Sequence, residues 1–347
     1  MFYIHQASCI SPQQTFNEID IDMLYKPVEK RLLAIEPVME GVPASILRRM
    51  SKVVRMGIAT AMQVLKDKPK PDGIIIGTAN SGQEDCVKFL NQIIEYNEGL
   101  LTPLNFVQST PNAVAAQISL LTKNHGYNIT HLHLGLAFEL AMIDADMMLE
   151  ENEGHSYLLG AIDDISSYNF LFEEKNGYHK EGNISNKDLY KTDSPGSIMG
   201  EAASMFLVNG NSNGAIAKVL GVETLHTADE TTVKEKMHLF VGKYLPVGEQ
   251  IDLLLTGENG DSRFLKYYSV CESLMLEEVS VARFKHMSGE FPTAAGMGLW
   301  LACEILQKQS LPVHMVKKDT DKKHYKNILI YNTYKGEQHS IILVAGH

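Results

Sequence analysis

The chain has 347 residues, of which 44% are hydrophobic and 21% charged, and its formal net charge is −11. This ordinary globular composition supplies enough apolar residues for a large core. The acidic balance argues against nucleic acid and anionic membranes as partners, and no stretch approaches the roughly 18 uninterrupted apolar residues of a membrane span.

The N-terminal segment and the cysteines indicate a cytoplasmic protein. The first five residues, Met-Phe-Tyr-Ile-His, have no basic region and no long apolar run, so they predict a first strand and not a signal peptide. The four cysteines form no Cys-x-x-Cys pair and fit neither a zinc site nor a disulfide framework; they are Cys9, Cys86, Cys271 and Cys303. We therefore expect a reduced, cytoplasmic setting, with no metal and no other cofactor.

Strands and helices alternate through the first half of the chain. Apolar spacing predicts helices, and short β-branched runs predict strands. The predicted elements are a helix within 45–66, a buried strand at 73–77, helices at 82–97 and 112–122, a strand at 127–132, a helix at 133–149 and a strand at 156–163. The alternation indicates an α/β fold in which helices cover a sheet.

The second half of the chain repeats this organisation. A polar stretch at 170–195 predicts a surface excursion. The elements that follow are strands at 203–208, 215–223, 251–255, 327–331 and 339–345, with a helix at 293–307. This helix, like the one at 133–149, is apolar on nearly every side. Two buried helices, each preceded by a strand or turn, suggest two similar halves.

Six short segments occur in a characteristic order. They are residues 10–12 (Ile-Ser-Pro), 47–51 (Leu-Arg-Arg-Met-Ser), 76–82 (Ile-Gly-Thr-Ala-Asn-Ser-Gly), 109–119, 196–203 (Gly-Ser-Ile-Met-Gly-Glu-Ala-Ala) and 285–296. In order and spacing they resemble the motifs of the thiolase-fold condensing enzymes, in particular the elongating β-ketoacyl-acyl-carrier-protein synthases.

This resemblance implies a thiolase-like fold. Two similar βαβαβαββ halves would be arranged in five layers, α-β-α-β-α. The N-terminal half, similar to the β-ketoacyl synthase N-terminal domain, would span residues 1–210. The C-terminal half would span residues 211–347.

The resemblance also indicates that the catalytic nucleophile is missing. The family places a Cys at a strand–helix junction in the motif Thr-Ala-Cys-x-x-Gly, where a helix N-terminus stabilises the thiolate and backbone N–H groups hold the oxyanion. Residues 130–135 (Thr-His-Leu-His-Leu-Gly) are similar to that motif, with Leu132 at the Cys position. Leucine forms no acyl intermediate.

Two further family positions are changed. The family's two His residues assist decarboxylation and stabilise the resulting enolate. Thr256 or its neighbour stands at the first position and Glu290 at the second, whereas the family's Lys is retained as Lys285. An anionic Glu would repel an enolate, and the family's C-terminal Gly-Phe-Gly-Gly gate is unrecognisable in residues 332–337.

These changes favour a catalytically degenerate, chain-length-factor-like subunit. Such a subunit would pair with an active ketosynthase in fatty-acid, polyketide or aryl-polyene-type biosynthesis, and would meet an acyl carrier protein. Two alternatives remain open. One is an active 3-oxoacyl synthase or other acyltransferase with relocated catalytic residues, drawn from His131, His133, Cys303 or Glu290. The other is a homodimeric acyl-binding or scaffold protein.

A basic cluster at helical spacing suggests where a carrier protein would dock. The cluster contains Arg48, Arg49, Lys52 and Arg55. It stands out on an acidic chain, and the related enzymes use basic residues near this helix for docking. A solvated helix face is the alternative interpretation.

Overall fold

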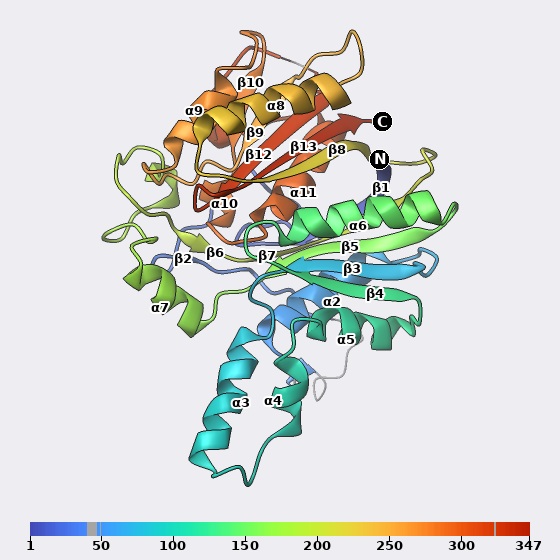
Figure 1. Ribbon diagram of the computed structural model, residues 1–347, viewed down its shortest axis with the longest axis vertical. Helices are drawn as coiled ribbons and strands as arrows, with labels where there is room; N and C mark the ends of the chain where they lie inside the picture. The colour runs from blue at the N-terminus through green and yellow to red at the C-terminus, as the bar shows by residue number, and fades with distance from the viewer. Residues whose placement is uncertain (40–46, 49, 323) are drawn as a thin grey trace.

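The computed structural model describes residues 1–39, 47–48, 50–322 and 324–347. Within these residues, 11 strands form one continuous sheet. Its two halves, called the first and the second sheet below, join where β1 pairs with β8 through Phe2–Ile4 (Figure 1). In spatial order the first sheet contains β4 (Tyr127–Leu132), β3 (Gly73–Thr78), β5 (Ser156–Asp163), β7 (Ala202–Asn209) and β1 (Phe2–Ile10). The second contains β8 (Ala217–His226), β13 (Gln338–Gly346), β12 (Asn327–Tyr334), β9 (Leu253–Thr256), β10 (Ser280–Arg283) and β11 (Val316–Lys318). A separate parallel pair joins β2 (Arg31–Leu32) to β6 (Met199–Gly200).

Helices complete five layers around these sheets. The outer face of the first sheet is covered by α2 (Lys52–Val64) and α5 (Ala113–Thr122), and that of the second by α8 (Glu230–Tyr244) and α9 (Leu265–Glu272). Between the sheets lie α6 (Ala137–Glu151) and α11 (Ala294–Lys308) (Figure 1). The α-β-α-β-α arrangement expected from the sequence is confirmed.

The strands divide the core because successive side chains point to opposite faces of a sheet. In β3, Ile75 faces the central layer whereas Ile74 and Ile76 face α2 and α5. In β9, Leu254 faces outward between Leu253 and Leu255, which face the central layer. Burial of one such side chain contributes about 2 kcal/mol, so both faces of each sheet stabilise the fold.

Most predicted elements are present, with shifted ends. The helix predicted at 133–149 begins only at Ala137, because residues 133–136 form the turn that leads out of β4. The first residues of the helix predicted within 45–66 lie outside the described residues, and the described helix there is α2. The predicted boundary between the two halves, after residue 210, lies in the turn between β7 and β8.

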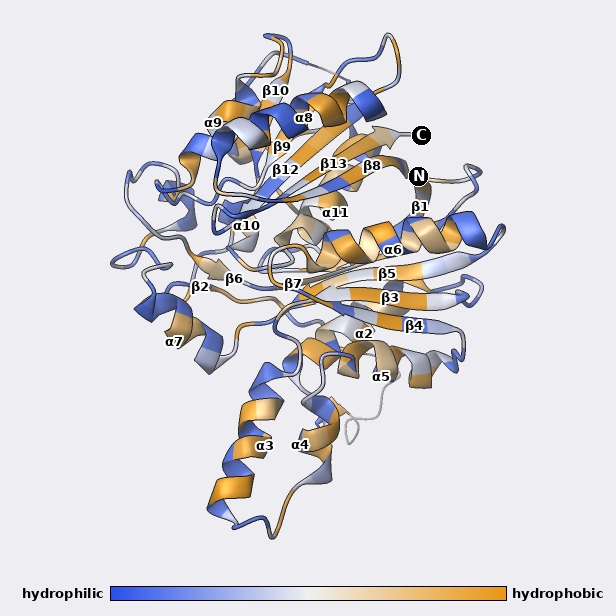
Figure 2. Ribbon diagram, viewed as in Figure 1, coloured by the Kyte–Doolittle hydropathy of each residue, from blue (hydrophilic) through white to orange (hydrophobic). Residues whose placement is uncertain are grey.

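Two helices form an arm that projects from the layered body (Figure 1). They are α3 (Gln83–Glu95) and α4 (Pro103–Gln108), of which the sequence predicted only the first. Both carry apolar side chains that stay exposed, including Leu90, Ile94 and Phe106 (Figure 2). Exposed apolar surface of this kind marks an interaction site more often than a solvated loop.

The stretch at 170–195 is not the simple surface excursion that its polarity predicted. It begins within α7 (Ser167–Lys175) and also contains the 3-10 turn η1 (Asn186–Asp188). Lys180 is buried, and its ammonium donates to the carbonyls of Ser194 and Gly260 at 2.6 and 2.7 Å. These buried hydrogen bonds fasten the stretch to the second half of the chain.

Among the described helices, none is long and apolar enough to cross a membrane.

Candidate active-site cavity

A cavity of about 480 Å³ lies where loops of the two halves meet. Its walls come from the turn after β4, from α7 and the segment after it, from the loop after β9, and from the β12–β13 turn. Its lining residues include Leu134, Asn259, Glu290, Tyr334 and Lys335. Cavities of this size commonly hold small molecules or parts of them.

A buried ion pair forms the polar centre of this cavity. The Lys285 ammonium lies 2.8 Å from both oxygens of Glu290, and the Asn259 amide donates to the same carboxylate at 2.5 Å. Lys285 is completely buried on the short helix α10 (Lys285–Ser288), whereas Glu290 reaches the cavity. Three hydrogen bonds thus occupy much of the accepting capacity of the Glu290 carboxylate.

Burial acts on both members of the pair. Desolvation lowers the pKa of Lys285 and raises the pKa of Glu290, while the attraction between the two charges opposes each change. Removing one partner of such a pair costs about 3–5 kcal/mol, because the other charge remains buried alone.

A second carboxyl group lies close to the same lysine. Glu139 stands in the first turn of α6 with no exposed surface, and burial raises its pKa to about 7, although Ser340 and Lys285 act in the opposite direction. Neither carboxyl oxygen of Glu139 has a hydrogen-bond partner among the described residues. The positive charge of Lys285 therefore acts on two carboxyl groups, those of Glu139 and Glu290.

Leu132 does not stand where the sequence analysis expected it. It is the last residue of β4, pairs with Thr78 of β3, and is 58% exposed. It is not among the described residues that line the cavity. Leu132 therefore does not face Thr256 or Glu290 across the cavity, because β4 continues through residue 132 and the chain turns toward α6 only afterwards.

Gly135 occupies the interior of that turn. An added Cβ there would lie 2.1 Å from the Cβ of Tyr334, so the tyrosine fills the space that a side chain would need. The Gly135 backbone N–H donates to the Oε1 atom of Gln338 at 2.7 Å. Both the side-chain space and this backbone donor of the strand–helix junction are therefore taken by the β12–β13 hairpin.

The same hairpin is tied across the mouth of the cavity. Lys335 forms an ion pair with Glu173 of α7 at 2.8 Å, and its ammonium lies 4.3 Å from the ring centre of Tyr178. The unrecognisable gate segment thus supplies both Tyr334 and Lys335 to the cavity.

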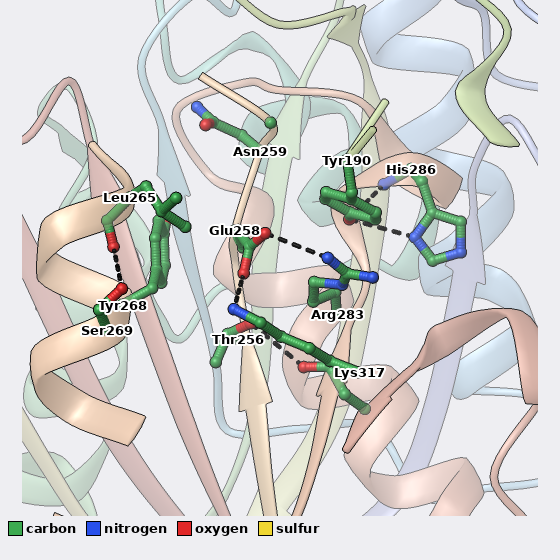
Figure 3. Close-up of polar contacts among 12 residues, drawn as sticks. Tyr190, Thr256, Glu258, Asn259, Leu265, Tyr268, Ser269, Arg283, His286 and Lys317 are labelled. Carbon is green, nitrogen blue, oxygen red and sulfur yellow. Dashed lines mark hydrogen bonds and ion pairs between the residues drawn. The ribbon is translucent and has the colours of Figure 1, made fainter. Parts of the chain in front are cut away.

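The loop after β9 sends its side chains to two sides, as Figure 3 shows. Thr256 is buried at the strand end and donates to the carbonyl of Ala282 at 3.2 Å. Glu258 pairs with Arg283 and Lys317, whereas Asn259 turns the other way, toward Glu290. The sequence analysis singled out Thr256, but Asn259 is the residue of this loop that contacts Glu290.

The other candidate catalytic residues do not gather here. His131 lies 3.0 Å from Asp144 on α6, and the buried Nδ1 atom of His133 has no hydrogen-bond partner among the described residues. Cys303 is buried in α11, and burial raises its pKa, which disfavours the reactive thiolate. None of the three is among the described residues that line the cavity, and the described part of the chain contains no group of three or more His, Cys, Asp or Glu residues placed to hold a metal ion.

The predicted docking cluster is only partly free. Lys52 is paired with the buried Glu201, and Arg55 donates to Glu36 at 2.7 and 2.9 Å. Arg48 is exposed, and Arg49 lies outside the described residues. Docking of an acidic carrier protein here stays a prediction, with Arg48 as its best-placed described member.

Comparison with known proteins defines the class. The layered fold, the two central helices and the cavity at the end of one of them are the architecture of the thiolase-fold condensing enzymes. Residues 29–174 match the family model for the β-ketoacyl synthase N-terminal domain. The resemblance to the β-ketoacyl synthases that the sequence motifs indicated is thus confirmed for this stretch and for the fold.

Solved structures agree over the full length. A β-ketoacyl synthase from Burkholderia phymatum STM815 is 13% identical with a TM-score of 0.79, covering 100% of this chain and 99% of that chain. The ketosynthase ApeO in complex with its chain length factor ApeC from Xenorhabdus doucetiae is 12% identical with a TM-score of 0.75, covering 100% of this chain and 98% of that chain. A type II polyketide synthase acyl carrier protein in complex with its ketosynthase, AntDE:AntF, is 15% identical with a TM-score of 0.72, covering 100% of this chain and 99% of that chain. No curated protein matches the sequence.

Proposed function

We propose that the chain is a non-catalytic β-ketoacyl-synthase-like subunit that pairs with an active ketosynthase, in the manner of a chain length factor. One observation carries the proposal: the junction between β4 and α6 has no acylatable side chain. Residues 132–138 contain no Cys, Ser or Thr. At Gly135 the side-chain space is filled by Tyr334, and the backbone N–H is bonded to Gln338.

The charges in the cavity support the same proposal. A condensing enzyme must stabilise an enolate, which carries negative charge. Glu290 presents a carboxylate to the cavity, and its neighbours Lys285 and Asn259 already donate to it. We assign Glu290 and the loop that begins at Thr256 to the two degenerate His positions, and the whole junction, including Leu132, to the lost nucleophile.

The edge of the first sheet is suited to hold the partner. β4 is hydrogen-bonded only on its β3 side among the described strands, and every one of its residues is at least partly exposed. Leu132 and Leu134 are 58% and 53% exposed at its end. An unpaired strand edge with exposed leucines is a template for pairing with another chain. The α3–α4 arm, which carries hydrophobic segments coloured orange in Figure 2, adds further exposed apolar side chains, including Leu90 and Phe106.

The chemistry is tested with the purified chain alone. We expect no covalent adduct by intact mass after incubation with acetyl and hexanoyl thioesters, and no elongated product from malonyl carrier protein. An acyl adduct or an elongated product would refute the proposal and favour an acyltransferase with relocated residues.

The partnership is tested by coexpression with a ketosynthase from the same genome that retains the family's Cys and its two His residues. We expect a stable heterodimer with elongating activity, and an inactive ketosynthase when this chain is omitted. A chain that forms a stable self-dimer and ignores the ketosynthase would overturn the partnership, and would favour a homodimeric acyl-binding or scaffold protein.

A further inference from the structure

A second cavity, of about 770 Å³, lies away from the strand–helix junction. Three stretches enclose it: residues 20–24 after β1, residues 186–191 around η1, and the end of β10 with α10, joined by His314. Its lining carries charges of both signs; they are Asp20, Asp22, Lys187, Lys191 and Arg283. The proposed function makes no use of this cavity.

Three rings form an ordered wall of the cavity. His314 Nε2 lies 2.7 Å from the carbonyl of Ile21, which only accepts, so this nitrogen carries a hydrogen. In the neutral ring, His314 Nδ1 then accepts from His286 Nε2 at 2.8 Å. His286 Nδ1 in turn accepts from the Tyr190 hydroxyl at 3.2 Å (Figure 3). Both imidazole N–H groups thus donate to acceptors already described, so the wall of three rings is ordered and uncharged.

Hydrogen-bond donors remain free on one side of this wall. The Arg283 guanidinium lies 3.8 Å from the ring centre of Tyr190 and donates through Nη1 to Glu258, but its Nε has no partner among the described residues (Figure 3). Lys187 is exposed and makes no ion pair with the described part of the chain. A ligand carboxylate would be a suitable acceptor for these two cations.

Acceptors remain free as well. The Asn186 side chain donates to the carbonyls of Tyr25 and His286, but its Oδ1 is completely buried without a partner. The Asp22 carboxylate accepts no hydrogen bond from the described residues, whereas Asp20 is used to accept from two backbone N–H groups of its own turn. An ammonium group would supply the donors that these acceptors lack.

The unpaired charges stand close without neutralising one another. Burial lowers the pKa of His314, and among the smaller influences the charge of Asp22 raises this pKa whereas that of Lys187 lowers it, so both charges act on the same ring. No ion pair within 4.0 Å joins them in the described structure. Opposite charges that face one space and remain separate are suited to a ligand that carries both signs.

We propose that this cavity binds a small zwitterion, a molecule with a carboxylate at one end and an ammonium at the other. The carboxylate lies against Arg283 and Lys187, and the ammonium against Asp22 and the Asn186 carbonyl oxygen. The His286 and His314 rings, with centroids 5.0 Å apart, form the wall between these ends. The site is independent of the proposed partner subunit role.

Titration calorimetry with three matched probes tests this proposal. The probes are 6-aminohexanoate, which carries both charges, hexanoate, which carries only the anion, and hexylamine, which carries only the cation. We expect 6-aminohexanoate to bind at least about tenfold more tightly than either control, since each end adds a charge-assisted hydrogen bond. Equal binding of hexanoate or of hexylamine, or no binding of 6-aminohexanoate, would overturn the proposal.

Variants at exposed positions locate the site without threatening the fold. Lys187→Gln and Asp22→Asn should each weaken 6-aminohexanoate by about tenfold. Lys234→Gln and Glu235→Gln, at exposed positions on α8, should leave its affinity unchanged. Unchanged affinity in both cavity variants, or an equal loss in the α8 variants, would place binding elsewhere and refute the site.

Discussion

The two central helices lie in the same layer, but they are buried to different degrees. Every residue of α11 from Ala294 to Leu306 is buried. On α6 only seven residues of the 15 are buried, and Met147 is 56% exposed. The compositions differ in the same direction, because α6 carries five acidic residues and α11 only one. This chain encloses α11 completely and leaves the β4–α6 edge incomplete.

The entrances to the two helices are closed in different ways. At α11, the buried Asp163 accepts from the Thr293 hydroxyl at 2.8 Å and also from the backbone N–H groups of Ala79 and Asn80 at the end of β3. At α6, the closing groups are Tyr334 and Gln338 of the hairpin. The first arrangement joins the two halves, whereas the second fills the turn between β4 and α6.

The largest expected effect compares the two helices directly. Leu301→Ala in α11 should lower the free energy of unfolding by about 2–5 kcal/mol, because the side chain is completely buried. Met147→Ala in α6, a truncation of similar size, should change it by less than about 0.5 kcal/mol. Urea denaturation of the isolated chain measures both values. A similar loss in both variants would mean that the two helices do not differ as described.

The next effect tests the buried carboxyl group at the entrance to α6. Burial raises the pKa of Glu139 to about 7, above the value of an unfolded glutamate. The native state therefore holds a proton that the unfolded state releases, and wild-type stability falls as the pH rises from about 4.5 to about 7. Glu139→Gln removes this loss, so its advantage over wild type should be absent near pH 4 and reach at most about 3 kcal/mol at pH 8.

Glu150→Gln is the matched control for this titration, because Glu150 is an exposed acid on the same helix. The control should run parallel to wild type across the whole pH range in urea denaturation. A Glu139→Gln curve that also ran parallel would show that this carboxyl group does not titrate between pH 4.5 and 7.

A cysteine at the junction tests whether the hairpin truly closes it. Gly135→Cys should destabilise the chain by about 1–3 kcal/mol through contact with Tyr334, whereas Gly210→Cys, where nothing lies within 4 Å of an added Cβ, should not. In a Tyr334→Gly background, which removes the Cβ and the ring that an added side chain would meet, the cost of Gly135→Cys should shrink. Rapid acylation of the introduced thiol in the Gly135→Cys single variant would contradict a closed junction.

The sequence was sufficient for the layers but not for the site. Periodicity predicted β3, β4 and β5 because strand patterns are local. It placed the start of α6 at residue 133, because an apolar turn is indistinguishable from an apolar helix by pattern alone. Tyr334 and Asn259 were missed since their importance comes from contacts with Gly135 and Glu290, which lie far away in the chain.

The smallest effect on the isolated chain is expected at the exposed sheet edge. Leu132 is 58% exposed at the end of β4, so Leu132→Glu should change the free energy of unfolding by less than about 0.5 kcal/mol. If β4 pairs with a ketosynthase, the same substitution buries a charge in the interface and should weaken the heterodimer by more than about tenfold. Leu239→Glu, on the outer helix α8 and 65% exposed, should affect neither quantity. Because stability and association are measured on the same variants, loss of association without loss of stability distinguishes an interface residue from a core residue. Unchanged association of Leu132→Glu would remove this edge from the interface.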